Sequence, residues 1–444
     1  MGGRWTAEQV IALAADASSV IAGRALAVSH RWTAAGASTR PPAVWGQCAG
    51  PGRAPYQTIV DLGRPAYRCS CPSRKLPCKH AIALLLLWAD EQVPEQAEPD
   101  VAAAAWLATR AERRQRADSA QKGDGPADPV AAVKRAEQRA ARVAAGVNEL
   151  RQWLGDCART GLAGWDRAGY GPADAVAARL VDAQAPGLAN WVRNLPGVAA
   201  SGDGWPNRLL TELALLHLLT AAHERAHQLP PGLASTVRSR VGYPVRTKDV
   251  LETEPVRDFW NVLSLDDDLQ ERLTVRRVQL HGARSGRGAI VLSFSAGGQP
   301  LDSSLLPGTC IDADLHFYPA ALPSRALVGE RYSEPGPLMH TGGLSIDQAV
   351  AAWARALAAD PWTNEVPMVL RDVVPVPPAD ANPGRPSGWM VRDQTSKGLR
   401  LRPSQGLWTL LSISGGHPVT LVAGYTAHGL RASAVRVDDR MVPL

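Results

Sequence analysis

Four residues with metal-ligating side chains lie within a stretch of twelve positions, Cys69, Cys71, Cys78 and His80. They form two pairs with the same spacing, C-x-C and C-x-H, separated by six residues. Zn²⁺ in structural sites prefers four sulfur and nitrogen ligands at the corners of a tetrahedron. Side chains at i and i+2 of an extended strand point to the same side, so one such pair can face one ion. The pattern therefore predicts one Zn²⁺ ion held by three thiolates and one imidazole.

The chain around these ligands, PAYRCSCPSRKLPCKHAIALLLLW at residues 65–88, indicates the elements that position them. The β-forming residues before the first cysteines, with a turn at Gly63–Pro65, predict a β-hairpin. Pro77 then precedes an Ala- and Leu-rich run that predicts a buried helix. Cys78 and His80 are expected at the start of this helix, where the helix dipole favours a thiolate.

Four protein ligands leave no open coordination position, so the predicted zinc site is structural and not catalytic. Cys48, upstream in WGQCAG, is a fifth candidate ligand. Because the set of four is already complete, we interpret Cys48 as a half-buried thiol. Cys157 and Cys310 are interpreted as thiols of the core.

Four cationic residues flank the ligands, Arg68, Arg74, Lys75 and Lys79. They would offset the negative charge of a Cys₃His site and lower the pKa of its thiols. The same side chains could contact the phosphates of a nucleic acid, or a protein partner. The alternative is that they only balance the charge of the site and solvate a small module.

The ligand pattern resembles the SWIM zinc finger, and the longer string WGQCAGPGRAPYQTIVDL…YRCSCPSRKLPCKHAIALLLLW is similar to bacterial SWIM zinc finger proteins of about this length. The wider likeness covers roughly residues 1–93, and a weaker one lies at LWTLLSISGGHPVTL. The resemblance implies a short ββα module that binds DNA or protein partners. It also implies a MoxR-type AAA ATPase and a von Willebrand factor A (VWA) protein as partners, because such proteins are typically encoded beside the bacterial members.

A second motif, HERAH at residues 223–227, matches H-E-x-x-H. On a helix, His223 and His227 would share one face and could hold zinc, with Glu224 as the base of a metalloprotease. The preceding segment predicts a leucine-rich helix and not an edge strand, and no third ligand is evident. We therefore interpret both histidines as partners of free carbonyls at a helix end and keep the metalloprotease as a remote alternative.

Asp266–Asp268 are interpreted as a loop or a helix N-cap and not as a cation site.

The net charge and the absence of catalytic and nucleotide-binding motifs limit the classes of function that fit the sequence. The net charge of +6 over 444 residues permits nucleic-acid binding but does not demand it. No phosphate-cradling, dinucleotide-binding or nucleophile-elbow motif is present. We predict that the chain is not an enzyme but a zinc-binding protein–protein adaptor. The alternative is a DNA- or RNA-binding protein that uses the basic residues around the zinc.

Periodicity and composition predict an α+β multidomain chain. Its expected parts are an N-terminal region over residues 1–93 with the zinc finger at about 56–90, a flexible linker over 94–129, a helical domain over 130–255 and a mixed α+β domain over 256–444. The N-terminal region is expected to contain one helix over residues 5–26, with a capping box of Thr6 and Gln9, and strands over 43–69.

The C-terminal region is expected to contain two strands paired around Ala283–Gly286, a helix over 346–359, and short strands to the end, of which LWTLLSIS is one.

No apolar run approaches the ~18 residues that span a bilayer. The N-terminus has the pattern of an amphipathic helix and not of a signal peptide. We therefore expect a soluble, cytoplasmic protein without a membrane partner.

Overall fold

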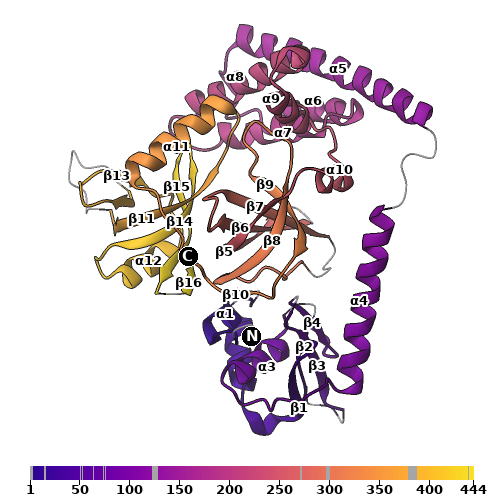
Figure 1. Ribbon diagram of the computed structural model, residues 1–444. Coiled ribbons are helices and arrows are strands. Elements are labelled where there is room, and N and C mark those ends of the chain that lie inside the picture. The colour runs from indigo at the N-terminus through magenta and orange to yellow at the C-terminus, as the bar shows by residue number, and fades with distance from the viewer. Residues whose placement is uncertain are drawn as a thin grey trace.

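The structure, a computed structural model, describes residues 4–14, 17–50, 52, 54–63, 65–73, 75, 77–122, 129–270, 273–296, 301–378, 388–438 and 440–444. These residues form twelve α-helices and three β-sheets, so the fold is mixed α+β as predicted. Figure 1 shows a small N-terminal module below, a helical layer above, and two β-rich units between them. The domain boundaries at residues 93, 129 and 255 stay a prediction.

The N-terminal module is a four-stranded antiparallel sheet covered by helices. Its elements are α1 (Ala7–Ala12), α2 (Ala17–Leu26), β1 (Trp32–Thr39), β2 (Pro42–Cys48), β3 (Tyr56–Asp61), β4 (Ala66–Cys69) and α3 (Lys79–Ala89). The strands lie in the order β1-β2-β3-β4, and β3 and β4 form the predicted hairpin. Nine consecutive residues of α3, His80 to Trp88, are buried, because the sheet covers one side of the helix and α2 another.

The prediction of one helix over residues 5–26 is wrong, because α1 ends at Ala12 and α2 begins at Ala17. The capping box is confirmed: Thr6 Oγ1 accepts from Gln9 N, and Gln9 Oε1 accepts from Thr6 N. The break lets α1 and α2 each contact α3. Gly23 makes the second contact close, since a Cβ atom there would lie 2.7 Å from Ile82 Cγ2.

The segment predicted as a flexible linker contains a long helix, α4 (Val101–Lys122). The prediction is therefore wrong for this part of 94–129, while residues 123–128 lie outside the described chain. The first turns of α4 are held by packing, because Ala103, Trp106 and Leu107 contact Trp45 and Ile59 of the sheet. Figure 1 shows α4 running from the N-terminal module toward the helical layer.

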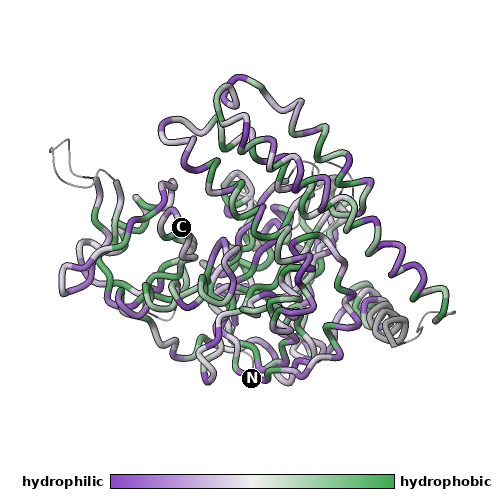
Figure 2. Tube along the Cα trace, turned by 90° about the horizontal axis from the view of Figure 1, so that it is seen from above, coloured by the Kyte–Doolittle hydropathy of each residue, from purple (hydrophilic) through white to green (hydrophobic). Residues whose placement is uncertain are grey.

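The helical layer consists of α5 (Pro129–Thr160), α6 (Gly171–Asp182), α7 (Pro186–Ala199), α8 (Trp205–Glu224), α9 (Pro231–Val241) and the short α10 (Thr247–Leu251). Its core is one apolar cluster to which α5 contributes Val143, Val147, Leu150 and Leu154, at the spacing of a single helix face. Figure 2 shows the corresponding alternation of hydrophobic and hydrophilic residues along these helices.

The second sheet closes into a small barrel. Its strands are β5 (Val256–Gln270), β6 (Leu273–Gly282), β7 (Gly288–Ala296), β8 (Thr309–Phe317), β9 (Arg325–Arg331) and the two-residue β10 (Gly336–Pro337). The order is β10-β8-β5-β6-β7-β9, and β8 also pairs with β9, which closes the ring. The predicted pairing around Ala283–Gly286 is confirmed by β6 and β7.

Asp266–Asp268 lie in β5, so the interpretation as a loop or helix cap is wrong. The strand register explains why an acidic run stays extended here. Asp266 lies opposite Arg277 and Asp267 lies opposite Arg276, which binds it through two hydrogen bonds. Opposite charges at facing positions stabilise an antiparallel pair.

The third sheet has the order β13-β12-β11-β14-β15-β16 and packs against α11 (Ile346–Ala359) and α12 (Gly406–Ser414). Its strands are β11 (Val366–Val376), β12 (Met390–Arg392), β13 (Gly398–Arg400), β14 (Val419–Thr426), β15 (Gly429–Val437) and β16 (Arg440–Pro443). The predicted helix over 346–359 is confirmed by α11.

The strand predicted at LWTLLSIS is instead the helix α12. The buried residues Leu407, Leu410 and Ser414 recur at helical spacing, and Gly415 ends the helix in the left-handed conformation with φ of 54°. A run that is apolar on most positions fits either a buried strand or a helix, so the sequence pattern alone does not separate them.

The N-terminal module docks on the loop that precedes β8. Leu306 of this loop belongs to the core of the module. Gln9 Nε2 donates to Gly308 O at 3.0 Å, and Ser303 Oγ donates to Pro65 O at 2.8 Å. The second contact reaches the turn of the β3–β4 hairpin, which links that hairpin to the barrel.

Among the described residues, no helix is both long and apolar enough to cross a bilayer.

The tryptophan just after α11 joins the C-terminal region to the helical layer. Trp362 is 3% exposed, lies in the core of the helical layer and donates through Nε1 to Leu215 O at 2.9 Å.

We expect Trp362→Ala to lower the free energy of unfolding by about 3–5 kcal/mol, because it empties a large buried volume. Trp408→Ala is the control, since Trp408 is 63% exposed, and it should cost about 1 kcal/mol or less. Equal losses in denaturant titrations would contradict this role of Trp362.

Candidate metal centre

Two separate pieces of chain bring the four candidate ligands together. Cys69 is the last residue of β4, opposite Thr58 of β3, and Cys71 lies in the bend that follows. Cys78 is the N-cap residue of α3, and His80 lies in its first turn. The hairpin thus supplies one pair and the start of the buried helix supplies the other, as the sequence predicts.

The distances among these side chains fit a tetrahedral zinc site. All four ligand atoms lie within 4.8 Å of one another. His80 Nδ1 lies 3.7 Å from Cys69 Sγ and 4.0 Å from Cys78 Sγ. With Zn–S bonds of about 2.3 Å and Zn–N bonds of about 2.0 Å, tetrahedral geometry places ligand atoms about 3.5–3.8 Å apart. The residues therefore fit one zinc ion after only small movements.

The thiols influence each other's pKa even without metal. A hydrogen bond from the Cys78 thiol holds the pKa of Cys69 well below its usual range. The same hydrogen bond, together with burial, raises the pKa of Cys78. Burial also raises the pKa of Cys71. Zinc must therefore displace protons from thiols when it binds, and its affinity should fall as the pH falls.

Two neighbours that the sequence did not single out support the ligands. Thr58 Oγ1 lies 3.3 Å from Cys69 Sγ, within hydrogen-bond distance, and Thr58 is fully buried. The ring of Tyr56 packs against His80 with 4.9 Å between ring centroids. Thr58 and Tyr56 lie on β3, before the ligand motif in the sequence. Only the pairing register of β3 with β4 places them beside the ligands, and the ligand spacing does not reveal that register.

The flanking cations lie on the surface of the module. Arg68, Lys75 and Lys79 are exposed, and Arg74 lies outside the described residues. Their contact with a phosphate or a partner stays a prediction.

The other cysteines stand apart from the cluster. Cys48 is fully buried in the core of the N-terminal module, so it is more buried than the half-buried thiol we expected. In the described chain, Cys69, Cys71, Cys78 and His80 are the only group of three or more candidate ligands close enough to hold one ion. Cys157 and Cys310 are buried as predicted.

The H-E-x-x-H motif does not form a metal site of this kind. α8 ends at Glu224, so His227 lies in the 3₁₀ turn after the helix. His223 stacks on Tyr243, with Nε2 3.3 Å from the hydroxyl oxygen, and Glu224 pairs with Arg151. Burial lowers the pKa of His223. Within the described residues, no third ligand joins the two histidines.

Comparison with known families identifies two segments. Residues 59–89 match the family model of the SWIM zinc finger. The chain carries a SWIM zinc finger. The match begins in β3 and ends with α3, so it covers the second half of β3, β4, the four ligands and the buried helix.

Residues 138–241 match the SWIM-associated four-helix bundle domain. This match runs from within α5 to the end of α9, and it accounts for the helical layer that the sequence predicted from periodicity alone. No curated protein and no solved structure matches the chain significantly.

The SWIM zinc finger of this chain fits one structural zinc ion. Three thiolates and one imidazole would complete a tetrahedral shell and would leave no coordination position for a substrate or a reactive water. SWIM zinc fingers and the associated bundle are in general binding modules without catalytic activity.

We expect Cys71→Ser and His80→Ala to lose nearly all bound zinc, because each removes one of four ligands. Since metal binding contributes folding free energy, residues 66–89 should also lose amide-exchange protection while the bundle keeps its protection. Zinc per chain and hydrogen exchange measure the two effects.

The double variant His223→Ala/His227→Ala and the variant Cys48→Ser serve as controls and should keep one zinc per chain. If purified Cys71→Ser retained stoichiometric zinc, the assignment of the ligands would be wrong. If the histidine double variant lost a second zinc, the H-E-x-x-H motif would be a metal site.

Proposed function

We propose that this chain is a zinc-stabilised adaptor, without catalytic activity, that binds a protein partner through its helices. The observation that carries this proposal is a stripe of exposed apolar side chains on each of two well-packed helices. Zinc has a structural role in this account, since it folds the module that anchors the N-terminal part of the chain to the barrel.

The first stripe lies on α8. Leu210 and Leu218 are 57% and 44% exposed, and the exposed Ala214 lies between them at the i+4 position. The opposite face of α8 is buried in the core of the bundle through Leu209, Leu213 and Leu216. A helix fixed on one face and apolar on the other presents the spacing that a partner helix or groove recognises.

The second stripe lies on α11, where Val350 and Leu357 are 43% and 38% exposed and Ala354 is exposed between them. Trp362, just after α11, donates to the carbonyl of Leu215 on α8, which ties the two helices to one another. Exposed apolar side chains are common singly, but two stripes on linked helices favour a protein contact.

The partners to test are the MoxR-type AAA ATPase and the VWA protein that the resemblance implies. We expect Leu218→Asp and Leu357→Asp to weaken binding of such a partner at least about tenfold, because a buried carboxylate would lack a counter-charge. Ile21→Asp is the matched control: Ile21 is 71% exposed on α2, away from both stripes. Biosensor affinities measure the effect, and stripe variants that bind as tightly as the control would contradict the proposal.

Nucleic-acid binding is the second candidate function, favoured by the exposed side chains of Arg68, Lys75 and Lys79 beside the zinc finger. It predicts an affinity for DNA or RNA that falls steeply with salt, since phosphate contacts release counterions. The adaptor proposal expects no such salt-dependent binding at physiological ionic strength. A mobility-shift titration at several salt concentrations separates the two.

A further inference from the structure

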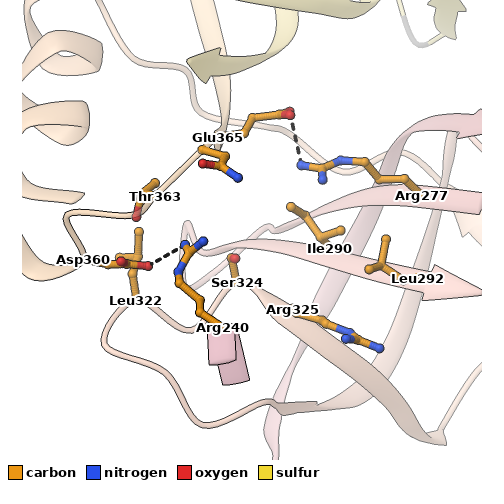
Figure 3. Close-up of a pocket in the computed structure, with 11 residues that line it drawn as sticks. Arg240, Arg277, Ile290, Leu292, Leu322, Ser324, Arg325, Asp360, Thr363 and Glu365 are labelled. Atoms are coloured by element: carbon orange, nitrogen blue, oxygen red, sulfur yellow. Dashed lines mark hydrogen bonds and ion pairs between the residues drawn. The ribbon is translucent and has the colours of Figure 1, made fainter. Parts of the chain in front are cut away.

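Two cavities of the structure differ in how their charges are balanced. In the smaller one, about 260 Å³ between the bundle and the barrel, Arg240 pairs with Asp360 at 3.0 Å and Arg277 pairs with Glu365 at 3.1 Å (Figure 3). These two arginines therefore already have acceptors within the protein. The larger cavity, about 480 Å³, has no carboxylate among its described lining residues. A ligand of the larger cavity would meet a charge that no lining carboxylate compensates.

The larger cavity lies between α11, β13 and the turn that joins β14 to β15. Two hydrogen bonds of Thr426 hold the turn: its Oγ1 donates to Gly429 O at 2.7 Å and accepts from the backbone N–H of His428 at 3.1 Å. Gly429 has φ of 107°, and a Cβ atom there would lie 2.6 Å from Arg400 O and 3.4 Å from Arg400 Cβ. A glycine therefore lets the turn pack directly against β13, which brings Arg400 and His428 to one cavity.

Two aromatic side chains line this cavity. Trp353 of α11 stacks on Tyr425 of β14, with 5.2 Å between ring centroids and 13° between ring planes. Both residues are half-buried, and within the described residues neither the indole N–H nor the phenol hydroxyl makes a hydrogen bond. Burial raises the pKa of Tyr425, so its hydroxyl stays protonated at neutral pH. Since aromatic rings pack well on further rings in offset or edge-to-face geometry, this wall favours a ligand with a planar ring.

Arg400 supplies the charge of the cavity. It is exposed, and it forms no ion pair with any residue in the described ranges. His428 is exposed as well, and the described lining residues include no lysine, aspartate or glutamate. A cationic ligand would meet Arg400 without a counter-charge, whereas a carboxylate or a phosphate matches the guanidinium fork. The cavity therefore favours an anion.

We propose that this cavity binds a small anionic aromatic ligand, a planar ring that carries a carboxylate or a phosphate. The ring packs beside Trp353 and Tyr425, and the anionic group pairs with Arg400. The volume falls within the roughly 300–1,000 Å³ typical of small-molecule sites. Trp353 follows Val350 by three positions and precedes Leu357 by four, so a bound ligand borders the apolar stripe of α11. The site does not depend on the proposed adaptor function.

The test uses the full-length, zinc-loaded protein and calorimetric titration with naphthylacetate and naphthyl phosphate. Naphthylacetamide is the neutral probe, and it should bind at least about tenfold more weakly than the anionic probes, as expected for the loss of a charge-assisted hydrogen bond. Acetate and inorganic phosphate, which lack the ring, should show no saturable binding.

Arg400→Gln should weaken binding of the anionic probes about tenfold or more and leave the affinity for naphthylacetamide within about twofold of wild type. Because Arg400 is exposed, we expect this variant to fold. Arg402→Gln is the matched control, since Arg402 is exposed, lies two residues further along the chain and does not line the cavity. It should leave the affinity for all probes within about twofold of wild type.

Saturable binding of naphthylacetate or naphthyl phosphate that Arg400→Gln weakens supports the proposal, and the anion that binds more tightly identifies the anionic group of the ligand. Absence of saturable binding of both anionic probes would overturn it. Equal affinity for naphthylacetamide, equally tight binding of the ringless anions, or an equal loss in Arg402→Gln would overturn it as well.

Discussion

The N-terminal part of this chain depends on one geometric constraint: four ligand atoms from two pieces of chain must meet at the corners of one tetrahedron. The hairpin supplies Cys69 and Cys71, and the start of α3 supplies Cys78 and His80. Without metal, burial raises the pKa of Cys71, and the hydrogen bond with Cys69 together with burial raises the pKa of Cys78, so both thiols resist ionisation. Cys69, Cys71, Cys78 and His80 would hold a zinc ion, whose binding would stabilise the hairpin against the helix.

The same constraint extends beyond the finger. The hairpin turn at Pro65 accepts a hydrogen bond from Ser303, and Leu306 belongs to the core of the N-terminal module. The zinc finger is therefore part of a module that is bound to the barrel by these contacts. The bundle and α11 lie on the far side of the barrel from the finger, so the two exposed stripes lie away from the zinc finger (Figure 1).

Local patterns predicted much of this structure, and non-local contacts explain most of what they missed. The ligand spacing, the turn at Gly63–Pro65, the capping box at Thr6 and the periodicity of 346–359 each depend on residues close in sequence. In contrast, the start of α4 is held by Trp45 and Ile59 of the sheet, and Asp267 in β5 is bound by Arg276, which lies opposite it on β6. The apolar run of α12 fits a strand as well as a helix, so the sequence pattern alone does not predict the helix. Closure of the barrel requires β8 to pair with β9, which no local pattern encodes.

X-ray absorption spectroscopy at the zinc edge on the purified protein measures directly which atoms surround the zinc. We expect one zinc per chain with about three sulfur neighbours at ~2.3 Å and about one nitrogen neighbour at ~2.0 Å, and no oxygen ligand. Such a shell would establish a closed, structural centre built from Cys69, Cys71, Cys78 and His80. A shell with an oxygen neighbour or with fewer than three sulfurs would contradict it, because the site would then be open or built from other residues.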